Sequence, residues 1–226
     1  MRRQSLICAA ILLAAVVLAG CHADPSSVVI LNARAPGDKC AFDDDTVYVS
    51  GGSLDLRPYI LSAGGPTFQA QFFYQVFSWQ NNLVAVPLVV NGQTVDPGAG
   101  NNFIANQVFY SYQWSGAGQT FADEIANTHA VIFAGGTSKD NSIGIELLQP
   151  KAAAQLATIA TTTPQTLLVT FYVGGNLAGG NGLDTNKVTF PLTIYKSSDT
   201  TLDCSATGAV SSRCGSVGRD APLTCR

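Results

Sequence analysis

Residues that could carry acid–base catalysis are few in this chain. A Ser-His-Asp triad would need His129, because the other histidine, His22, lies near the N-terminus. His129 enters an apolar segment, and no Gly-x-Ser-x-Gly motif is present to supply a nucleophile elbow. We therefore interpret His129 as a strand-edge or surface residue and predict no triad.

Two adjacent carboxylates, Asp123 and Glu124, could take part in glycoside hydrolysis, which needs two carboxyl groups at a defined separation. Three other carboxylates could complete such a pair: Asp55, Glu146 and Asp184. No motif brings any of them together, so we assign no catalytic residue.

Metal and phosphate sites are equally poorly supported. The acidic run 43–45 lacks the alternating order of a calcium-binding loop, so we interpret it as a solvated turn. The glycine-rich segment 174–182 has neither the lysine nor the following helix of a phosphate-binding loop. We predict no metal site and no cofactor.

An aromatic group offers one route to ligand binding. Trp79, Tyr110, Tyr112 and Trp114 could form a flat face for sugar rings. Neighbouring amides would bind the hydroxyls: Asn81, Asn82, Gln107 and Gln113. The tyrosines and Trp114 share one parity with polar residues between them, which is also the pattern of a core face. We favour the core interpretation.

The N-terminus has the pattern of an export signal. Arg2 and Arg3 precede an apolar run over residues 6–20. A helix of that length spans roughly 22 Å, which is short of the ~30 Å hydrocarbon core of a bilayer. A cleaved signal is therefore favoured over a permanent transmembrane helix.

The run ends in Leu18, Ala19, Gly20 and Cys21, which resembles the bacterial lipobox. The resemblance implies diacylglycerol on the Cys21 thiol and cleavage after Gly20. It also implies acylation of the new amino group, and several acyl chains make an anchor effectively permanent. His22 stands where an aspartate would resemble an inner-membrane retention signal, so the expected destination is the outer membrane.

Composition limits the partners. The formal net charge is -3 and charged residues make up 12% of the chain, about half the usual share. This balance argues against nucleic acid as a partner. With 46% hydrophobic residues, the chain can bury a sizeable core. We divide it into a signal, a lipidated tether, one β-domain and a cysteine-containing tail: residues 1–20, 21–27, 28–196 and 197–226.

Apart from Cys21 and from Cys8, which lies within the signal, four cysteines remain: Cys40, Cys204, Cys214 and Cys225. In an exported chain an even number indicates disulfides, and here three pairings are open. We favour Cys214 with Cys225 and Cys40 with Cys204, which would staple the tail to the start of the domain.

Short β-branched or aromatic segments separated by turn residues dominate the middle of the chain. We expect about ten strands, among them residues 28–31, 46–50, 54–61, 68–77, 83–90, 107–114, 130–134, 143–148, 167–173 and 188–195. Asn91 and Gly92 predict a tight hairpin, and residues 150–157 the one short helix. The fold class is therefore all-β, an antiparallel, immunoglobulin-like β-sandwich with a disulfide-stapled C-terminal tail.

Two groups of motifs stand near the two ends of the domain. The first is Cys40-Ala41-Phe42 leading to residues 52–59. The second is Phe190-Pro191-Leu192-Thr193-Ile194 followed by Cys204, Cys214 and residues 218–226. With the lipobox they resemble a group of uncharacterised, exported, cysteine-tailed lipoproteins of myxobacterial type. Tyr195 and Lys196 stand where members of that group often carry a further cysteine. The resemblance implies location and architecture but no reaction.

These observations predict a lipid-anchored envelope protein that acts as a non-catalytic structural or adhesive interaction module. Its partners would be the membrane, through the anchor, and an envelope protein or glycan. The alternative is a lipoprotein that binds a carbohydrate or small ligand on its aromatic face. An envelope hydrolase is the least favoured interpretation.

Overall fold

The computed structural model describes the β-domain and most of the tail. The described residues are 27–36, 42, 47–96, 98–136, 141–159, 163–197, 200–211 and 217–226. The predictions for the signal, for Leu18, Ala19, Gly20 and Cys21, for the acidic run 43–45, and for Cys40 and Cys214 lie outside these residues.

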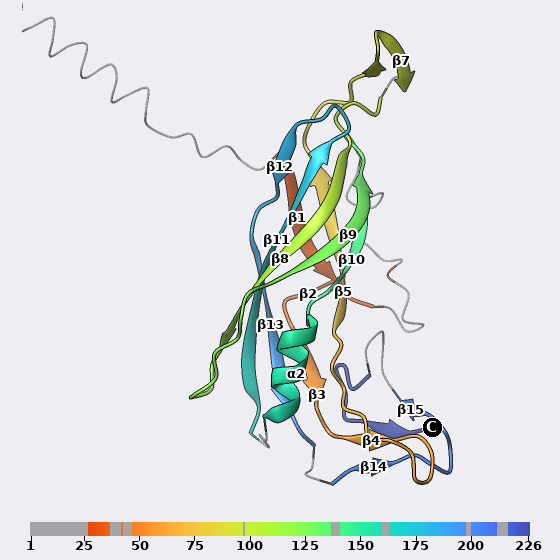
Figure 1. Cartoon of the computed structure of the whole chain (residues 1–226), viewed down its shortest axis with the longest axis vertical. Coiled ribbons are helices and arrows are strands. Elements are labelled where there is room, and N and C mark those ends of the chain that lie inside the picture. The colour runs from red at the N-terminus through yellow and green to blue at the C-terminus, as the bar shows by residue number, and fades with distance from the viewer. Residues whose placement is uncertain are drawn as a thin grey trace, which may run out of the picture.

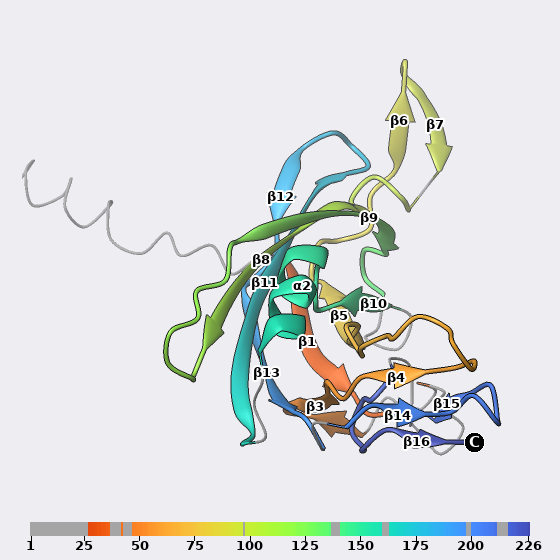
Figure 2. The ribbon, with the colours of Figure 1, turned by 60° about the horizontal axis from the view of Figure 1, so that its bottom comes forward.

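Two main sheets face each other, which confirms the predicted all-β sandwich (Figures 1 and 2). The smaller has the strand order β10 (Ser142–Glu146), β5 (Tyr74–Asn81), β1 (Val28–Arg34) and β2 (Tyr48–Val49). The larger has the order β3 (Gly52–Asp55), β13 (Val188–Tyr195), β11 (Gln165–Leu177), β8 (Phe103–Trp114) and β9 (Glu124–Ile132), with β12 (Gly182–Asp184) paired to β11. Within these two sheets, pairing is antiparallel except where β3 runs parallel to β13.

Three short two-stranded sheets complete the described strands. These are β6 (Leu88–Val90) with β7 (Gln93–Asp96), β14 (Leu202–Asp203) with β4 (Tyr59–Ile60), and β15 (Val210–Ser211) with β16 (Thr224–Cys225). The β6–β7 hairpin projects from one end of the long axis, and β4, β14 and β15 lie at the other end with the C-terminus (Figure 1).

Residues of alternate parity build the core between the sheets. In β11, Leu167, Val169, Phe171 and Val173 are buried while the residues between them are partly exposed. Phe77 of β5 contacts the Phe171 ring edge-on at 5.0 Å between centroids. Each large apolar side chain buried in this way stabilises the fold by about 1.5–3 kcal/mol. Burial therefore alternates along β11, although Leu168 and Tyr172 make its outer face partly apolar as well.

The hairpin and the helix agree with the sequence signals. Asn91 and Gly92 have φ values of 51° and 77° between β6 and β7, as a type I′ turn requires. Helix α2 (Pro150–Thr158) begins at Pro150, whose fixed φ suits the first helical position. It buries Ala152, Ala153 and Leu156.

Several predicted boundaries are wrong. Strand β5 begins at Tyr74 rather than Phe68, because Phe68 forms an isolated bridge with Tyr59 through two backbone hydrogen bonds of 2.7 Å. Strand β9 begins at Glu124, six residues before the predicted start at residue 130.

The glycine-rich segment at residue 174 continues β11 instead of forming a loop there, with a bulge between Gly174 and Gly175. A Cβ at residue 175 would lie 2.2 Å from the Ile104 carbonyl oxygen, so glycine is needed for the close approach of β8.

Two buried polar residues join the C-terminal tail to the sandwich. The Asp55 carboxylate accepts hydrogen bonds from the backbone N–H of Ser197 at 3.1 Å and of Leu223 at 3.0 Å. The Arg219 guanidinium donates to the Tyr74 carbonyl oxygen at 2.5 Å and to Gln75 Oε1 at 2.6 Å. The tail is therefore part of the folded domain, bonded to β3 and β5.

A disulfide closes the end of the tail, but its pairing differs from the favoured one. Cys204 is bonded to Cys225, with Cα atoms 5.3 Å apart. The pairing of β15 with β16 brings Cys225 back toward β14, next to Cys204. Cys214 with Cys225 and Cys40 with Cys204 are therefore wrong as pairs. Of the three possible pairings, only the one that joins Cys40 to Cys214 is compatible with this bond.

Replacing Cys204 and Cys225 together by alanine is expected to lower the free energy of unfolding by about 3 kcal/mol. The bond spans 21 residues, and a loop of that length costs the unfolded chain roughly this much conformational freedom. Urea denaturation measures the loss, and an unchanged midpoint would contradict it. Peptide mapping without reduction should recover Cys204 linked to Cys225 and Cys40 linked to Cys214.

Candidate functional site

The four aromatic residues considered for a sugar-binding face do not form an exposed platform. Trp79, Tyr110 and Tyr112 are 1%, 4% and 9% exposed, and Trp114 is half-buried against the core. The two tyrosine rings stack between the sheets with centroids 6.2 Å apart. Their burial agrees with the core interpretation favoured from the sequence and argues against the alternative of a ligand face, because the inner parity of β8 faces the smaller sheet.

The other candidate residues are dispersed. His129, Asp123 and Asp184 are exposed, whereas Asp55 and Glu124 are buried. Within the described ranges there is no group of three or more His, Cys, Asp or Glu residues that could hold a metal ion.

Glu124 has a structural role. Its Oε2 accepts the Lys151 N–H at 3.0 Å and its Oε1 accepts the Ala152 N–H at 2.8 Å. Gln149, at the N-cap position, makes no side-chain cap of its own. A carboxylate on β9 therefore caps helix α2, and its negative charge interacts favourably with the partial positive charge at the helix N-terminus.

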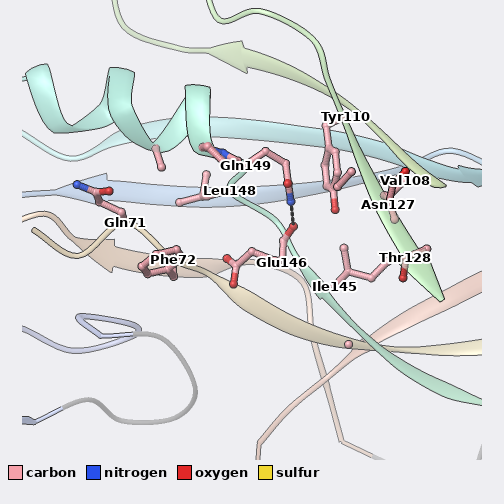
Figure 3. A pocket seen from close by; sticks show the side chains of 14 residues that line it. Gln71, Phe72, Val108, Tyr110, Asn127, Thr128, Ile145, Glu146, Leu148 and Gln149 are labelled. Atoms are coloured by element: carbon pink, nitrogen blue, oxygen red, sulfur yellow. Dashed lines mark hydrogen bonds between the residues drawn. The ribbon is translucent and has the colours of Figure 1, made fainter. Parts of the chain in front are cut away.

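A cleft of about 460 Å³ opens beside this helix terminus, between β8 and β9 of one sheet and β10 of the other (Figure 3). Its lining is mixed, with Val108, Ala126, Ile145, Leu148, Pro150, Ala153 and Phe72 as apolar residues and Gln71, Tyr110, Asn127, Thr128, Glu146 and Gln149 as polar ones, together with Gly144. Its size is in the range of small-ligand sites, and its wall can offer both apolar contact and hydrogen bonds.

Backbone contacts fix the polar groups of this cleft. Phe73 N–H donates to Glu146 Oε1 at 2.5 Å, and Gln149 Nε2 donates to the Glu146 carbonyl oxygen at 2.9 Å (Figure 3). The Tyr112 hydroxyl donates to the Leu147 carbonyl oxygen at 3.3 Å and accepts the Gln149 N–H at 3.2 Å. The segment from β10 to α2 is thus held in one conformation, and its polar groups are preorganised.

The electrostatics of the cleft favour neutral groups. Burial raises the pKa of the Glu146 carboxyl above its ordinary value, although N–H groups of Phe73 and Leu148 and the charge of Arg219 act in the opposite direction. Burial also raises the pKa of the Tyr110 and Tyr112 hydroxyls, so both stay protonated at neutral pH. The cleft can offer hydrogen bonds and apolar contact to a neutral ligand.

Replacing Glu146 by glutamine is expected to flatten the pH dependence of stability. A carboxyl whose pKa is raised in the folded state stabilises the fold below its unfolded pKa, and this contribution is lost as pH rises through the folded value. As the pH rises above about 4, the ordinary range of a glutamate carboxyl, urea denaturation should therefore show the variant gaining stability relative to the wild type. The amide oxygen can still accept the Phe73 N–H. Gln149→Ala alters the same cleft but leaves Glu146 in place, so its free energy of unfolding should change with pH as in the wild type. If the stability of Glu146→Gln also changes with pH as in the wild type, the expectation is refuted.

Sequence reasoning missed the cleft residues Phe72 and Gln149. Phe72 is 60% exposed while its neighbour Phe73 is fully buried. Two adjacent phenylalanines of opposite parity could have indicated that one of them faces away from the core. Nothing in the sequence marks Gln149 as a residue between two sheets.

Comparisons with protein families, with curated proteins and with solved structures found no match to this chain. The resemblance to exported cysteine-tailed lipoproteins therefore stays a prediction that rests on the quoted motifs. Among the described residues, no helix is long and apolar enough to cross a membrane.

Proposed function

We propose that this protein is an envelope lipoprotein, held at the outer membrane by acyl chains on Cys21, whose β-domain acts as a non-catalytic structural or adhesive interaction module. The lipobox supplies the anchor in this proposal. The β-sandwich, with the C-terminal tail bonded to it, would be the interaction module that the anchor holds at the membrane.

The observation that carries the proposal is the placement of the two ends of the domain. Asn82 N–H donates to the Ser27 carbonyl oxygen at 2.8 Å, so the chain enters the sandwich beside the end of β5. Strand β14, which ends just before the disulfide-bonded Cys204, lies at the opposite end of the long axis (Figure 1). A tether at one end would hold the stapled end away from the membrane, as a displayed module requires.

The roles of the buried carboxylates support a non-catalytic function. Glu124 caps α2, Asp55 binds the tail, and Glu146 accepts a backbone N–H. General acid–base catalysis needs a carboxyl group that can reach a substrate proton. Glu124 and Asp55 use both oxygens for the fold, so neither is suited to that role.

The anchor is tested first. Cells that express the protein should incorporate labelled palmitate into the wild type and not into Cys21→Ala. Mass spectrometry of the mature wild type should show an acylated N-terminus at Cys21. An unmodified N-terminus, or a retained signal, would overturn the anchor.

The interaction role is tested by proximity crosslinking in the native cell. The wild type should enrich discrete envelope proteins or glycan-bearing components, and Cys21→Ala should lose them. Recovery of the same bulk membrane proteins from both forms would refute an anchored interaction module.

The cleft favours a second candidate, the binding of a small neutral ligand. The neutral fluorophore N-phenyl-1-naphthylamine is a suitable probe because its fluorescence rises in apolar sites. Phe72→Ala should weaken its binding about tenfold or more, since a large exposed aromatic wall is removed. Ile125→Ala removes an equally exposed apolar side chain, 61% against 60%, that does not line the cleft, and should leave binding there unchanged. Equal affinities of the wild type and Phe72→Ala would contradict ligand binding in the cleft.

A further inference from the structure

The β6–β7 hairpin presents an unusual concentration of exposed apolar side chains. Five valines of this hairpin and its root are between 36% and 76% exposed: Val84, Val86, Val89, Val90 and Val95. The hairpin stands clear of the sandwich in both views (Figures 1 and 2). Its side chains therefore have no core to pack against.

The hairpin also lies in a nearly uncharged part of the chain. Asp96 is the only Asp, Glu, Lys or Arg between Arg57 and Asp123. The turn residues Asn91 and Gly92 are polar but neutral. Asp96 pairs with Leu88 at the root end of the hairpin, so the tip around the turn carries no charge and can enter a region of low polarity without the large cost of removing water from an ion.

The root of the hairpin is firmly bonded to the domain. Gly100 N–H donates to the Val86 carbonyl oxygen at 2.8 Å, and Asn101 Nδ2 donates to the Val84 carbonyl oxygen at 2.8 Å. Asn81 Nδ2 in turn donates to the Asn101 carbonyl oxygen at 2.8 Å. The direction in which the valines point is therefore fixed relative to the sheets.

The hairpin and the proposed anchor leave the domain at the same place. Val28 pairs with Asn81, the last residue of β5, and residues 82–87 then lead from β5 to the start of the hairpin at Leu88. Cys21 is six residues before Ser27, so a fully extended tether reaches at most about 20 Å. The hairpin extends about 17 Å from Val86 to its turn at Asn91, at roughly 3.4 Å per residue. The two lengths are comparable, so a lipid-anchored Cys21 leaves enough reach for the hairpin tip to touch the bilayer surface.

We propose that the β6–β7 hairpin inserts shallowly into the same membrane leaflet that holds the Cys21 acyl chains, as a second contact that fixes the orientation of the domain. This inference rests on the proposed anchor. Because the acyl chains alone hold the protein permanently at the membrane, the hairpin contact sets the orientation of the domain and is not needed to keep it attached. The two-stranded hairpin leaves backbone groups unpaired at its edges, so its place is the hydrated headgroup boundary rather than the hydrocarbon centre. The short tether makes this contact effectively intramolecular.

Tryptophan fluorescence in vesicles tests the contact. The full lipidated protein with Val90→Trp is reconstituted into phosphatidylethanolamine–phosphatidylglycerol vesicles that contain brominated phosphatidylcholine as a quencher. The added fluorescence should be quenched at least twofold, whereas the native Trp79 and Trp114 lie in or against the core and supply a fixed background. Ile125→Trp is the matched control, because Ile125 is 61% exposed on β9 and lies away from the hairpin, and it should not be quenched.

A charge on the hairpin provides a second variant. Val95 is 65% exposed, so Val95→Asp should leave the fold intact. In the Val90→Trp protein it should weaken insertion by about tenfold and return quenching toward the control.

Flotation of the vesicles separates the two proposals. Protein that does not float overturns the anchor and the hairpin contact with it. If the Val90→Trp protein floats while its added fluorescence is unquenched, the hairpin contact is overturned and the anchor stands. A blue-shifted but unquenched signal would mean that the hairpin is covered by protein, such as a second copy, and would likewise overturn a lipid contact.

Discussion

Arg219→Ala is expected to lower the free energy of unfolding by about 3–5 kcal/mol. The guanidinium is 1% exposed, donates to the Tyr74 carbonyl oxygen and to Gln75 Oε1, and forms an ion pair of 2.8 Å with Asp220. It also lies 4.6 Å from the centroid of the Phe73 ring. Truncation leaves buried acceptors without a donor and a cavity beside an aromatic ring, and breaking a buried charged network on one side is costly.

Chemical denaturation of the mature chain with Cys21→Ala measures this loss. Arg219→Lys should give an intermediate value, since an ammonium group cannot reproduce the planar fork that reaches several acceptors. Arg226→Ala removes an exposed arginine of the same tail and should change stability by less than about 0.5 kcal/mol. A loss below about 1 kcal/mol for Arg219→Ala would show that the tail is not held in this way.

Asp55→Ala is expected to cost a similar amount, about 3–5 kcal/mol. Asp55 is fully buried, and its carboxylate accepts the N–H groups of Arg57 at 2.9 Å, Ser197 at 3.1 Å and Leu223 at 3.0 Å, together with the Ser197 hydroxyl. Alanine leaves four donors without an acceptor, and each buried unpaired donor costs about 1–3 kcal/mol when the chain cannot relax.

The matched series separates charge from shape. Asp55→Asn keeps one oxygen acceptor but turns an NH₂ group toward N–H donors. It should therefore lower the free energy of unfolding by less than Asp55→Ala does. Asp184→Ala removes an exposed carboxylate of the larger sheet and should be nearly neutral. Equal stability of Asp55→Ala and the wild type would contradict the proposed role of Asp55. Limited proteolysis should also cut the tail faster in Asp55→Ala than in Asp184→Ala, because the Ser197 and Leu223 bonds hold it.

These two residues connect the fold to the proposed function. The Asp55 and Arg219 contacts hold the tail to β3 and β5, and the Cys204–Cys225 bond closes its end. A displayed module needs its distal end to keep one shape. The contacts that stabilise the tail would also hold the surface farthest from the proposed anchor.

Local sequence signals predicted the parts of the fold that local chemistry decides. The alternation around Tyr110 and Tyr112 predicted one face of β8, and the pair Asn91 and Gly92 predicted the hairpin. Pro150 marked the start of α2. Each of these signals lies within a few residues of the structure that it specifies, so no distant contact can easily override it.

The candidate site was less accessible from sequence. Tyr110 and Tyr112 were placed correctly on one face of a strand, and parity alone left open whether that face was core or ligand surface. The cleft combines residues of β8, β9, β10 and the start of α2. Its existence depends on how two sheets and a helix terminus meet, which no single periodic segment encodes.

The sequence by itself determined the all-β class, the strand faces, the turns and an N-terminus with the pattern of an exported lipoprotein. Tertiary structure alone decided that Cys204 pairs with Cys225, that Asp55 binds Leu223 across 168 positions, and that Arg219 reaches Gln75 across 144. The physical reason is distance along the chain. Such contacts form only when packing of the whole domain overcomes the entropy of closing long loops, and spacing in the sequence carries little information about which ends will meet.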